Sequence, residues 1–466
     1  MRFLISLVEV AERAMNGPRM DDMGWNMGLF KKSEELKAKY EIPEPGEDEL
    51  FCYDEDLADR AFDAGIELLS SLGLYCVSNG RVVELSCDEV LDSVRALPPE
   101  SQVGEGRDVR VFFKREIEDS RPPKIVGGLH GPVPEHLVRI IPKCFAEIPQ
   151  SDMMEGFNLI TIDGRRVHGV PIAAYTARRE ASLLREAVRA AGRPGMAVAL
   201  YPIHTDAAAM IAPLDPDQGL RRTDGALFSI LPDLKIELNY LTAAIVYEEY
   251  GAFKENRGGG GTFFTSVGGC IIGGIASSIA SWIAYRDRMI SCGAGRPGIS
   301  EPGISAPHRR ISDRVWPSSI VHMSLGRNSN MIRMGGSGHG NPGTLSTLID
   351  VAFQTIVSTV LGANINVDRV IFRTDPAVEL GGTPVETELT SSVSDAVVGS
   401  GMSREELEPI LRNLEEKHRK IDRRTEKTYP KFLDLYDPRK HRPLVEYQNK
   451  LAAIKSDLRD LGLDVK

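Results

Sequence analysis

Short apolar runs alternate with longer amphipathic stretches along the chain from about residue 124 onward. The apolar runs have the length of buried strands, and the longer stretches carry apolar residues at helical spacing. The runs that predict strands cover residues 124–128, 196–201, 226–230, 262–267, 288–292, 330–334 and 369–372. The helices predicted between them cover residues 177–191, 232–250, 270–285, 308–325 and 344–361. This alternation indicates an α/β protein whose parallel sheet is wrapped by helices.

The number of alternating units favours a closed barrel. Seven strands are predicted, and a hairpin region near Phe157 can hold an eighth. Eight strand–helix units over ~250 residues describe a TIM (β/α)8 barrel. A doubly wound open sheet gives the same alternation, so it stays an alternative on pattern alone.

The flanking parts of the chain are more charged and have a helical pattern, which predicts three parts in all. Residues 1–120 are predicted to form a helical N-terminal region with a β-hairpin, because strands 74–77 and 81–85 flank an Asn-Gly turn. Residues 121–400 are predicted to form the barrel. Residues 401–466 are predicted to form C-terminal helices that pack on the barrel.

One segment has the length and composition of a membrane span. Residues 267–285 carry no charged side chain and are long enough to cross a bilayer. The segment is also rich in glycine and serine, and such small residues let a helix pack closely on its neighbours. We therefore expect a buried helix inside the barrel protein and no contact with a membrane.

Charge and cysteine usage narrow the class of protein. The chain has 56 basic and 66 acidic residues, a formal net charge of −10, and it contains no basic block. This balance gives no electrostatic reason to expect nucleic acid or anionic lipid as a partner. The six cysteines form no CxxC pair, and the first residues do not have the pattern of a signal peptide. We expect a reduced, cytoplasmic protein.

A glycine-rich loop stands out among the motifs. Residues 338–343 read GHGNPG, between a predicted strand and a predicted helix. Glycines in this setting let a helix N-terminus approach an anion. No acidic residue is well placed about 20 positions further on to hold a ribose, so a tight loop at the barrel mouth is the other interpretation. His339 lies in this loop rather than on an apolar face.

Other polar residues follow predicted strands. His204 and Asp206 come after the strand 196–201, where barrel enzymes carry their working residues. Glu255 and Arg257 lie in a predicted loop, where the alternative interpretation is solvated charge. No histidine pair has the spacing of metal ligands with a carboxylate, so no metal site is predicted.

Several segments resemble one family. The segment 190–198, AAGRPGMAV, is similar to the monomethylamine:corrinoid methyltransferases of methylotrophic methanogens, as are segments 36–40, 123–128, 234–238 and 458–463. The resemblance implies a TIM barrel that assembles into a homo-oligomer. It also implies transfer of a methyl group from an amine to the cobalt of a separate corrinoid protein docked at the barrel mouth. The corrinoid would be carried by that partner, with no cofactor bound tightly to this chain.

The sequence departs from that family at its working positions. Ala199 stands where the amine-specific members have a pyrrolysine, whose electrophilic imine takes up the amine. The family's other working positions fall at or near Leu227, Glu255 or Arg257, Asn330 and Ile332. An alanine cannot replace an imine, so the family's mechanism is not expected here. A quaternary amine needs no imine adduct, because its leaving group is a neutral tertiary amine.

We therefore predict a methyltransferase without pyrrolysine that moves a methyl group from a small methylated amine or quaternary amine to a corrinoid protein. The predicted catalytic residues are Glu255, Arg257, Asn330 and His339, and the predicted substrate-binding residues are Ala199, Tyr201, His204 and Asp206. Gly336, Gly338 and Gly340 are predicted to expose backbone to the corrinoid at the C-terminal face of the barrel. The alternatives are a catalytically inactive paralogue that still docks the corrinoid protein, and a barrel enzyme acting on a phosphorylated small molecule.

Overall fold

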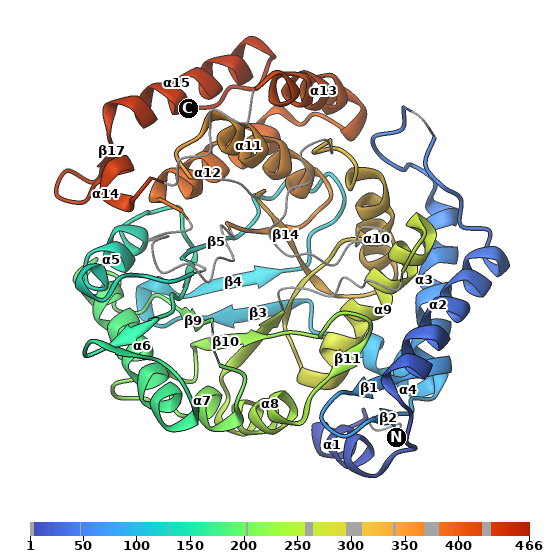
Figure 1. Ribbon diagram of the computed structural model, residues 1–466. Helices are drawn as coiled ribbons and strands as arrows, with labels where there is room; N and C mark the ends of the chain where they lie inside the picture. Colours follow the sequence, from blue (N-terminus) through green and yellow to red (C-terminus); the bar gives the residue numbers. More distant parts are fainter. Residues whose placement is uncertain are drawn as a thin grey trace.

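A closed barrel of eight parallel strands forms the centre of the molecule, and helices surround it (Figure 1). The computed structural model describes residues 4–46, 48–129, 131–201, 204–256, 264–294, 310–338, 342–367, 382–421 and 430–466. The strands are β5 (Ile125–Gly128), β6 (Met153–Glu155), β9 (Val198–Leu200), β10 (Gly225–Phe228), β12 (Phe253–Asn256), β13 (Met289–Ser291), β14 (Ile332–Gly336) and β15 (Asn364–Asn366). Around the barrel their order is β10-β12-β13-β14-β15-β5-β6-β9. The closed sheet confirms the predicted TIM barrel and excludes the open doubly wound sheet.

The helices that cover the barrel follow their strands in the chain. They are α5 (Ile141–Ala146), α6 (Val170–Ala190), α7 (Ala207–Ile211), α8 (Leu238–Tyr250), α9 (Val267–Tyr285), α10 (Val315–Asn328), α11 (Leu345–Val360) and α12 (Pro384–Ser400). Helix α8 begins six residues later than predicted, because β11 (Lys235–Ile236) occupies the preceding segment. Helix α6 begins seven residues earlier than predicted, with Pro171 in its first turn, where a missing N–H costs nothing.

Five predicted strands overlap barrel strands, and β6 supplies the eighth strand expected near Phe157. The strand predicted at 262–267 is wrong: in the part described, Ser266 is the N-cap of α9. The strand of that unit is β12, with the sequence FKEN. The strand predicted at 369–372 lies outside the described residues, and β15, with the sequence NIN, is the strand found before it. Both strands are rich in polar residues, so a search for apolar runs passes over them.

Within its described residues, the N-terminal region contains four α-helices and two hairpins. The helices are α1 (Leu7–Asn16), α2 (Asp22–Lys39), α3 (Glu55–Leu72) and α4 (Cys87–Arg95). The predicted hairpin is present as β1 (Leu74–Cys76) and β2 (Arg81–Val83), which pair antiparallel. Strand β1 also pairs in parallel with β11, so this region is hydrogen-bonded to the segment that follows β10.

A second hairpin fills the amino end of the barrel. Strands β3 (Glu100–Val103) and β4 (Arg110–Phe113) pair antiparallel and cross the barrel in Figure 1. Val103 and Phe112 are fully buried in one cluster with Phe253 and other residues at the beginnings of the barrel strands. The amino end of the lumen is therefore closed by apolar packing, which leaves the carboxyl end for polar side chains.

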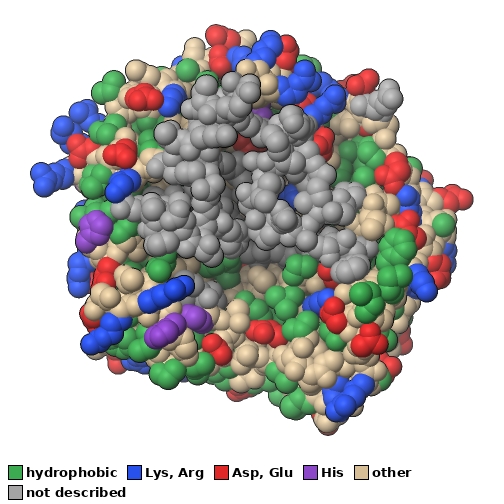
Figure 2. Space-filling model, in the orientation of Figure 1, with side chains coloured by type: hydrophobic (Ala, Val, Ile, Leu, Met, Phe, Trp, Pro, Cys, Tyr) green, Lys and Arg blue, Asp and Glu red, His purple; other side chains and the backbone are tan. Residues whose placement is uncertain are grey.

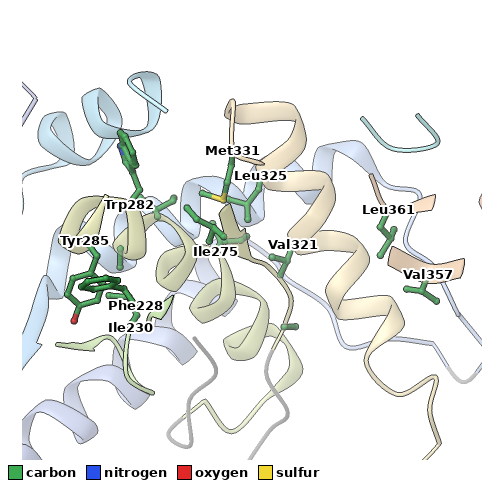
Figure 3. Packing of buried hydrophobic residues seen from close by; sticks show 14 of the residues in the cluster. Phe228, Ile230, Ile275, Trp282, Tyr285, Val321, Leu325, Met331, Val357 and Leu361 are labelled. Carbon is green, nitrogen blue, oxygen red and sulfur yellow. The ribbon is translucent and has the colours of Figure 1, made fainter. Parts of the chain in front are cut away.

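Helix α9 is the segment with the composition of a membrane span, and nearly all of its most apolar stretch is buried inside the protein. It packs against α3 and α10. In Figure 3, Ile275 and Trp282 of α9 lie in a cluster with Phe228 of β10 and Val321 of α10. Trp282 Nε1 donates a hydrogen bond to the Ser93 carbonyl at 2.9 Å. Protein packing therefore accounts for the apolar length of this helix.

The C-terminal segment continues with α13 (Arg404–Lys420), α14 (Phe432–Leu435), β16 (Tyr436–Asp437), β17 (Arg442–Pro443) and α15 (Val445–Asp460). Helices α13 and α15 pack on α11, at the top of Figure 1. Strands β7 (Thr161–Ile162) and β8 (Arg165–Arg166) form a small hairpin after β6. On the face shown in Figure 2, the described acidic and basic side chains are interspersed around the edge.

Candidate active site

The alternation of side chains along each strand separates the barrel lumen from the surrounding helices. On β12, Lys254 donates to Glu248 of α8 at 2.5 Å and so lies outside the barrel wall. Its neighbours Phe253 and Glu255 therefore face the lumen, because successive side chains of a strand point to opposite faces. The same alternation places Glu155 in the lumen above Met153, a member of the apolar cluster inside the barrel. Polar groups thus lie above an apolar layer.

Glu255 is fully buried at the third position of β12. It pairs in register with Leu227 of β10 on one side and with Met289 of β13 on the other. Burial, together with the negative charge of Glu255, holds the pKa of Asp287 well above its usual range, while the Ser281 hydroxyl and Lys254 oppose that shift. Because Glu255 faces the lumen from β12, it places a carboxylate inside the barrel. It lies on a strand and not on the predicted loop.

A second carboxylate lies three strands away from Glu255 around the barrel. Glu155 ends β6, and the order β6-β9-β10-β12 separates the two glutamates by almost half of the eight-stranded circuit. Asn366 of β15 donates from Nδ2 to Glu155 Oε1 at 3.1 Å. Both side chains are at most 2% exposed. The lumen therefore contains a Glu–Asn pair in addition to Glu255.

The Glu155–Asn366 contact depends on a glycine. Strand β5 lies between β15 and β6, and its inward residue at that level is Gly128, which pairs with Glu155. A Cβ atom at Gly128 would lie 2.7 Å from the Glu155 nitrogen and 2.9 Å from its Cβ. No side chain fits at this position, so Asn366 reaches across β5 to the carboxylate.

Ala199 lies between the two glutamates on β9. It is fully buried, pairs with Glu155 of β6 and with Gly225 of β10, and belongs to the apolar cluster inside the barrel. The predicted substrate-binding position therefore faces the lumen. Its side chain is a methyl group, which offers no hydrogen bond and no electrophile.

The other predicted substrate-binding residues follow β9 at the carboxyl end. Tyr201, His204 and Asp206 are each partly buried. The Tyr201 carbonyl accepts a hydrogen bond from the Asn158 amide. Burial raises the pKa of Glu237, just before α8, with a further contribution from the negative charge of Asp206 and an opposing hydrogen bond from Thr205. Glu237 therefore adds a carboxyl group to this rim that was not predicted from the sequence.

The prediction for Asn330 needs correction. Its side chain is exposed and precedes β14, which begins at Ile332 instead of residue 330. Asn330 therefore lies at the amino end of the barrel, away from Glu255 and from the carboxyl rim to which it was assigned. The physical reason is that a residue preceding a barrel strand lies at the opposite end of the barrel from the loops that follow the strands.

The predicted glycines differ in their exposure and in the space around their backbone. Gly336 ends β14, is exposed, and a Cβ there would meet nothing within 4 Å. Gly338 is buried, and a Cβ there would lie 2.7 Å from Asp350 Oδ2 of α11. Only Gly336 presents open backbone, and Gly338 packs on α11. Gly340, Arg257 and His339 lie outside the described residues.

In the described parts of the chain, no group of three or more His, Cys, Asp or Glu side chains could hold a metal ion. The polar groups that the fold brings together are carboxylates and amides. Such groups bind cations and N–H donors.

An eight-stranded parallel barrel with buried polar side chains near the carboxyl ends of its strands defines a (β/α)8-barrel protein with a site at its C-terminal face. The model of the family "Monomethylamine methyltransferase MtmB" matches residues 5–463. The chain therefore belongs to this family of methyltransferases.

Individual relatives show how similar this sequence is to other members of the family. The chain is 30% identical over 239 residues to monomethylamine methyltransferase MtmB2 of Methanosarcina acetivorans, an alignment that covers 51% of this chain and 52% of the relative. It is 29% identical over 240 residues to MtmB of Methanosarcina mazei, with the same coverage of 51% and 52%. The chain thus spans about half the length of the curated relatives it matches. The crystal structure of Methanosarcina barkeri MtmB superposes with a TM-score of 0.86 and 22% identity, over 99% of both chains.

Proposed function

We propose that this protein is a corrinoid-dependent methyltransferase that takes a methyl group from a small methylated amine or quaternary amine without a pyrrolysine. The single observation that carries the proposal is the fully buried Glu255 inside the barrel of a methyltransferase-family chain. A carboxylate in a site of low dielectric attracts an ammonium ion far more strongly than one in water. Such an ion is the form in which methylated amines occur at neutral pH.

Ala199 excludes covalent attachment of the amine at this position of the barrel. Its methyl side chain cannot form a covalent bond with an amine, so the substrate would be held by charge and hydrogen bonds alone. Glu255 and Glu155 both lie in the lumen, on strands three apart around the barrel, and supply the negative charge. Tyr201 at the rim adds an aromatic face for cation–π attraction. The roles of these side chains are to position the methyl group and to exclude water.

The corrinoid is proposed to enter on a separate partner protein at the carboxyl face. When docked, it supplies the nucleophile that accepts the methyl group. Gly336 supports this approach, because it is exposed at the end of β14 and leaves open space where a Cβ would stand. A flat, bulky ring fits against such bare backbone better than against a projecting side chain. Homo-oligomerisation and a cytoplasmic location, consistent with six free cysteines, complete the proposal.

Glu255→Gln tests the role of the buried carboxylate. The variant keeps the shape and removes the charge, so methyl transfer to a reconstituted corrinoid protein should fall by about 100-fold or more. Glu180→Gln is the matched control, because Glu180 is also a buried glutamate. It differs in its place, since it lies on α6 and accepts a hydrogen bond from the Leu159 N–H. Equal rates for the two variants would contradict the proposal.

A second function, a catalytically inactive paralogue that only docks the corrinoid protein, is favoured by one observation, the methyl side chain at position 199. It predicts partner binding without methyl transfer. The same assay, run beside a direct measurement of partner binding, separates the two functions. The barrel enzyme for a phosphorylated molecule depended on the glycine-rich loop 338–343, of which residues 339–341 lie outside the described residues.

A further inference from the structure

The two inward asparagines of β15 differ in how their hydrogen bonds are satisfied. Asn364 uses both ends of its amide: Oδ1 accepts from the Lys124 nitrogen at 2.9 Å, and Nδ2 donates to the Phe113 carbonyl at 3.0 Å. It therefore ties β15 to β5 and to the hairpin at the amino end. Asn366, one layer higher, uses only Nδ2, which donates to Glu155.

The amide oxygen of Asn366 is the remaining acceptor. It is buried, and it has no hydrogen-bond partner among the residues that the structure describes. The opposite orientation of the amide would place this oxygen against the Glu155 carboxylate, where two acceptors repel each other. Leaving a buried acceptor without a donor destabilises the folded protein, so such an atom in the lumen points to a missing donor.

The chemistry of a complementary ligand follows from the two groups together. Glu155 offers negative charge, and Asn366 Oδ1 offers an acceptor directed by the bond from Nδ2 to that same carboxylate. A ligand that satisfies both carries a positive charge and at least one N–H bond. A methylammonium, dimethylammonium or trimethylammonium ion meets both conditions, whereas a quaternary ammonium ion has no N–H to donate.

We infer that Asn366 is a specificity-determining residue, which with Glu155 binds the N–H-bearing head of a protonated methylated amine and disfavours quaternary amines. This inference rests on the proposed function and narrows its substrate class. Asn366 also positions Glu155, because the donated hydrogen bond fixes one oxygen of the carboxylate. Gly128 makes this arrangement available by leaving the space between the two strands free of a side chain.

Calorimetric titration of the full chain with the chlorides of methyl-, dimethyl-, trimethyl- and tetramethylammonium tests the inference in the absence of any corrinoid protein. The wild type should bind the three ions with N–H bonds about tenfold more tightly than tetramethylammonium, as expected for one hydrogen bond to a buried acceptor. Asn366→Leu, of similar size but without polar atoms, should reduce that preference to less than about twofold. Glu155→Gln should weaken all four ions, because it removes the charge that they share.

Two further variants keep the test decisive. In Asn366→Asp the two neighbouring carboxyl groups share one proton, so the new side chain can still donate to Glu155 and keeps an acceptor oxygen. This variant should keep the preference for ions with N–H bonds, and it serves where Asn366→Leu does not fold. Glu180→Gln, outside the lumen, should leave all four affinities unchanged. The inference is overturned if the wild type binds none of the ions, if it does not prefer those with N–H bonds, or if a folded Asn366→Leu retains the preference.

The titration also separates this inference from the proposed function. Selective binding without any methyl transfer to a corrinoid protein would support the role of Asn366 and contradict the proposed methyltransferase function. Methyl transfer with a substrate preference that Asn366→Leu does not change would support the proposed function and contradict the role of Asn366.

Discussion

At the residue scale, Gly128 is the position where the site depends most directly on the absence of a side chain. A Cβ there would lie 2.5 Å from the Glu155 carbonyl oxygen and 2.7 Å from its nitrogen, and backbone atoms cannot move aside cheaply. Gly128→Ala should therefore lower the free energy of unfolding by about 1–3 kcal/mol, measured by urea denaturation. Gly336→Ala is the control, because its new methyl group enters open space and should change stability by less than about 0.5 kcal/mol. Equal effects would contradict the packing described for β5.

Glu180 gives a prediction for the dependence of stability on pH. Burial raises its pKa from 4.5 to about 8, against the opposing hydrogen bond from Leu159. Between these values the folded state keeps the proton and the unfolded state loses it, so stability falls as pH rises through this window, by at most about 1.4 kcal/mol per pH unit. Glu180→Gln cannot ionise, so its stability relative to the wild type should increase between pH 5 and pH 8. A constant difference between the two proteins across this window would show that Glu180 ionises normally.

The sequence identifies some residues of the site and misses others for a physical reason. Glu255 is found because it is a charge near a working position of a related family, and Ala199 because it follows a recognisable block. Glu155 and Asn366 are 211 residues apart in sequence and meet only across β5. No local pattern reports which strands face each other across a barrel, so this pair becomes visible only in three dimensions.

At the scale of elements, the barrel was predictable from alternating runs, while two of its strands were not. Strands β12 and β15 read FKEN and NIN. Lys254 of β12 donates to Glu248 on a helix, and Asn364 of β15 is hydrogen-bonded to backbone groups rather than to solvent. Strands that line a polar lumen lose the apolar signal that marks a buried strand. The same polarity that hides them from a sequence pattern supplies the side chains of the proposed site.

The β3–β4 hairpin is an element that the sequence did not place inside the barrel. Phe112 is fully buried in the cluster that closes the amino end. Phe112→Ala should therefore cost about 3–5 kcal/mol of stability in thermal or urea unfolding. Its neighbour Phe113 is only partly buried and lies under the Arg121 guanidinium, 4.4 Å from the ring centre, so Phe113→Ala should cost clearly less. A larger cost for Phe113→Ala would mean that the hairpin does not fill the lumen in this register.

At the scale of the whole molecule, apolar and polar side chains occupy different levels along the axis of the barrel. Apolar residues and the hairpin occupy the amino end, and two carboxylates with an amide occupy the layer above them. Outside the barrel, the apolar side chains of helix α9 are buried by other helices, because α9 packs against α3 and α10. The chain keeps the scaffold of its family with only 22% identity to the Methanosarcina barkeri structure. The same fold is therefore kept although most positions of the two sequences differ.

We propose that this scaffold transfers methyl groups without an electrophilic side chain at position 199. The visible absorption spectrum of a reduced, reconstituted corrinoid protein, mixed with this protein and each of the four methylated ammonium ions, tests this directly. We expect conversion of the corrinoid to its methylated form with at least one ion that bears an N–H bond, and slower or no conversion with tetramethylammonium. No conversion with any of the four, while a pyrrolysine-containing family member converts the same corrinoid protein, would contradict it.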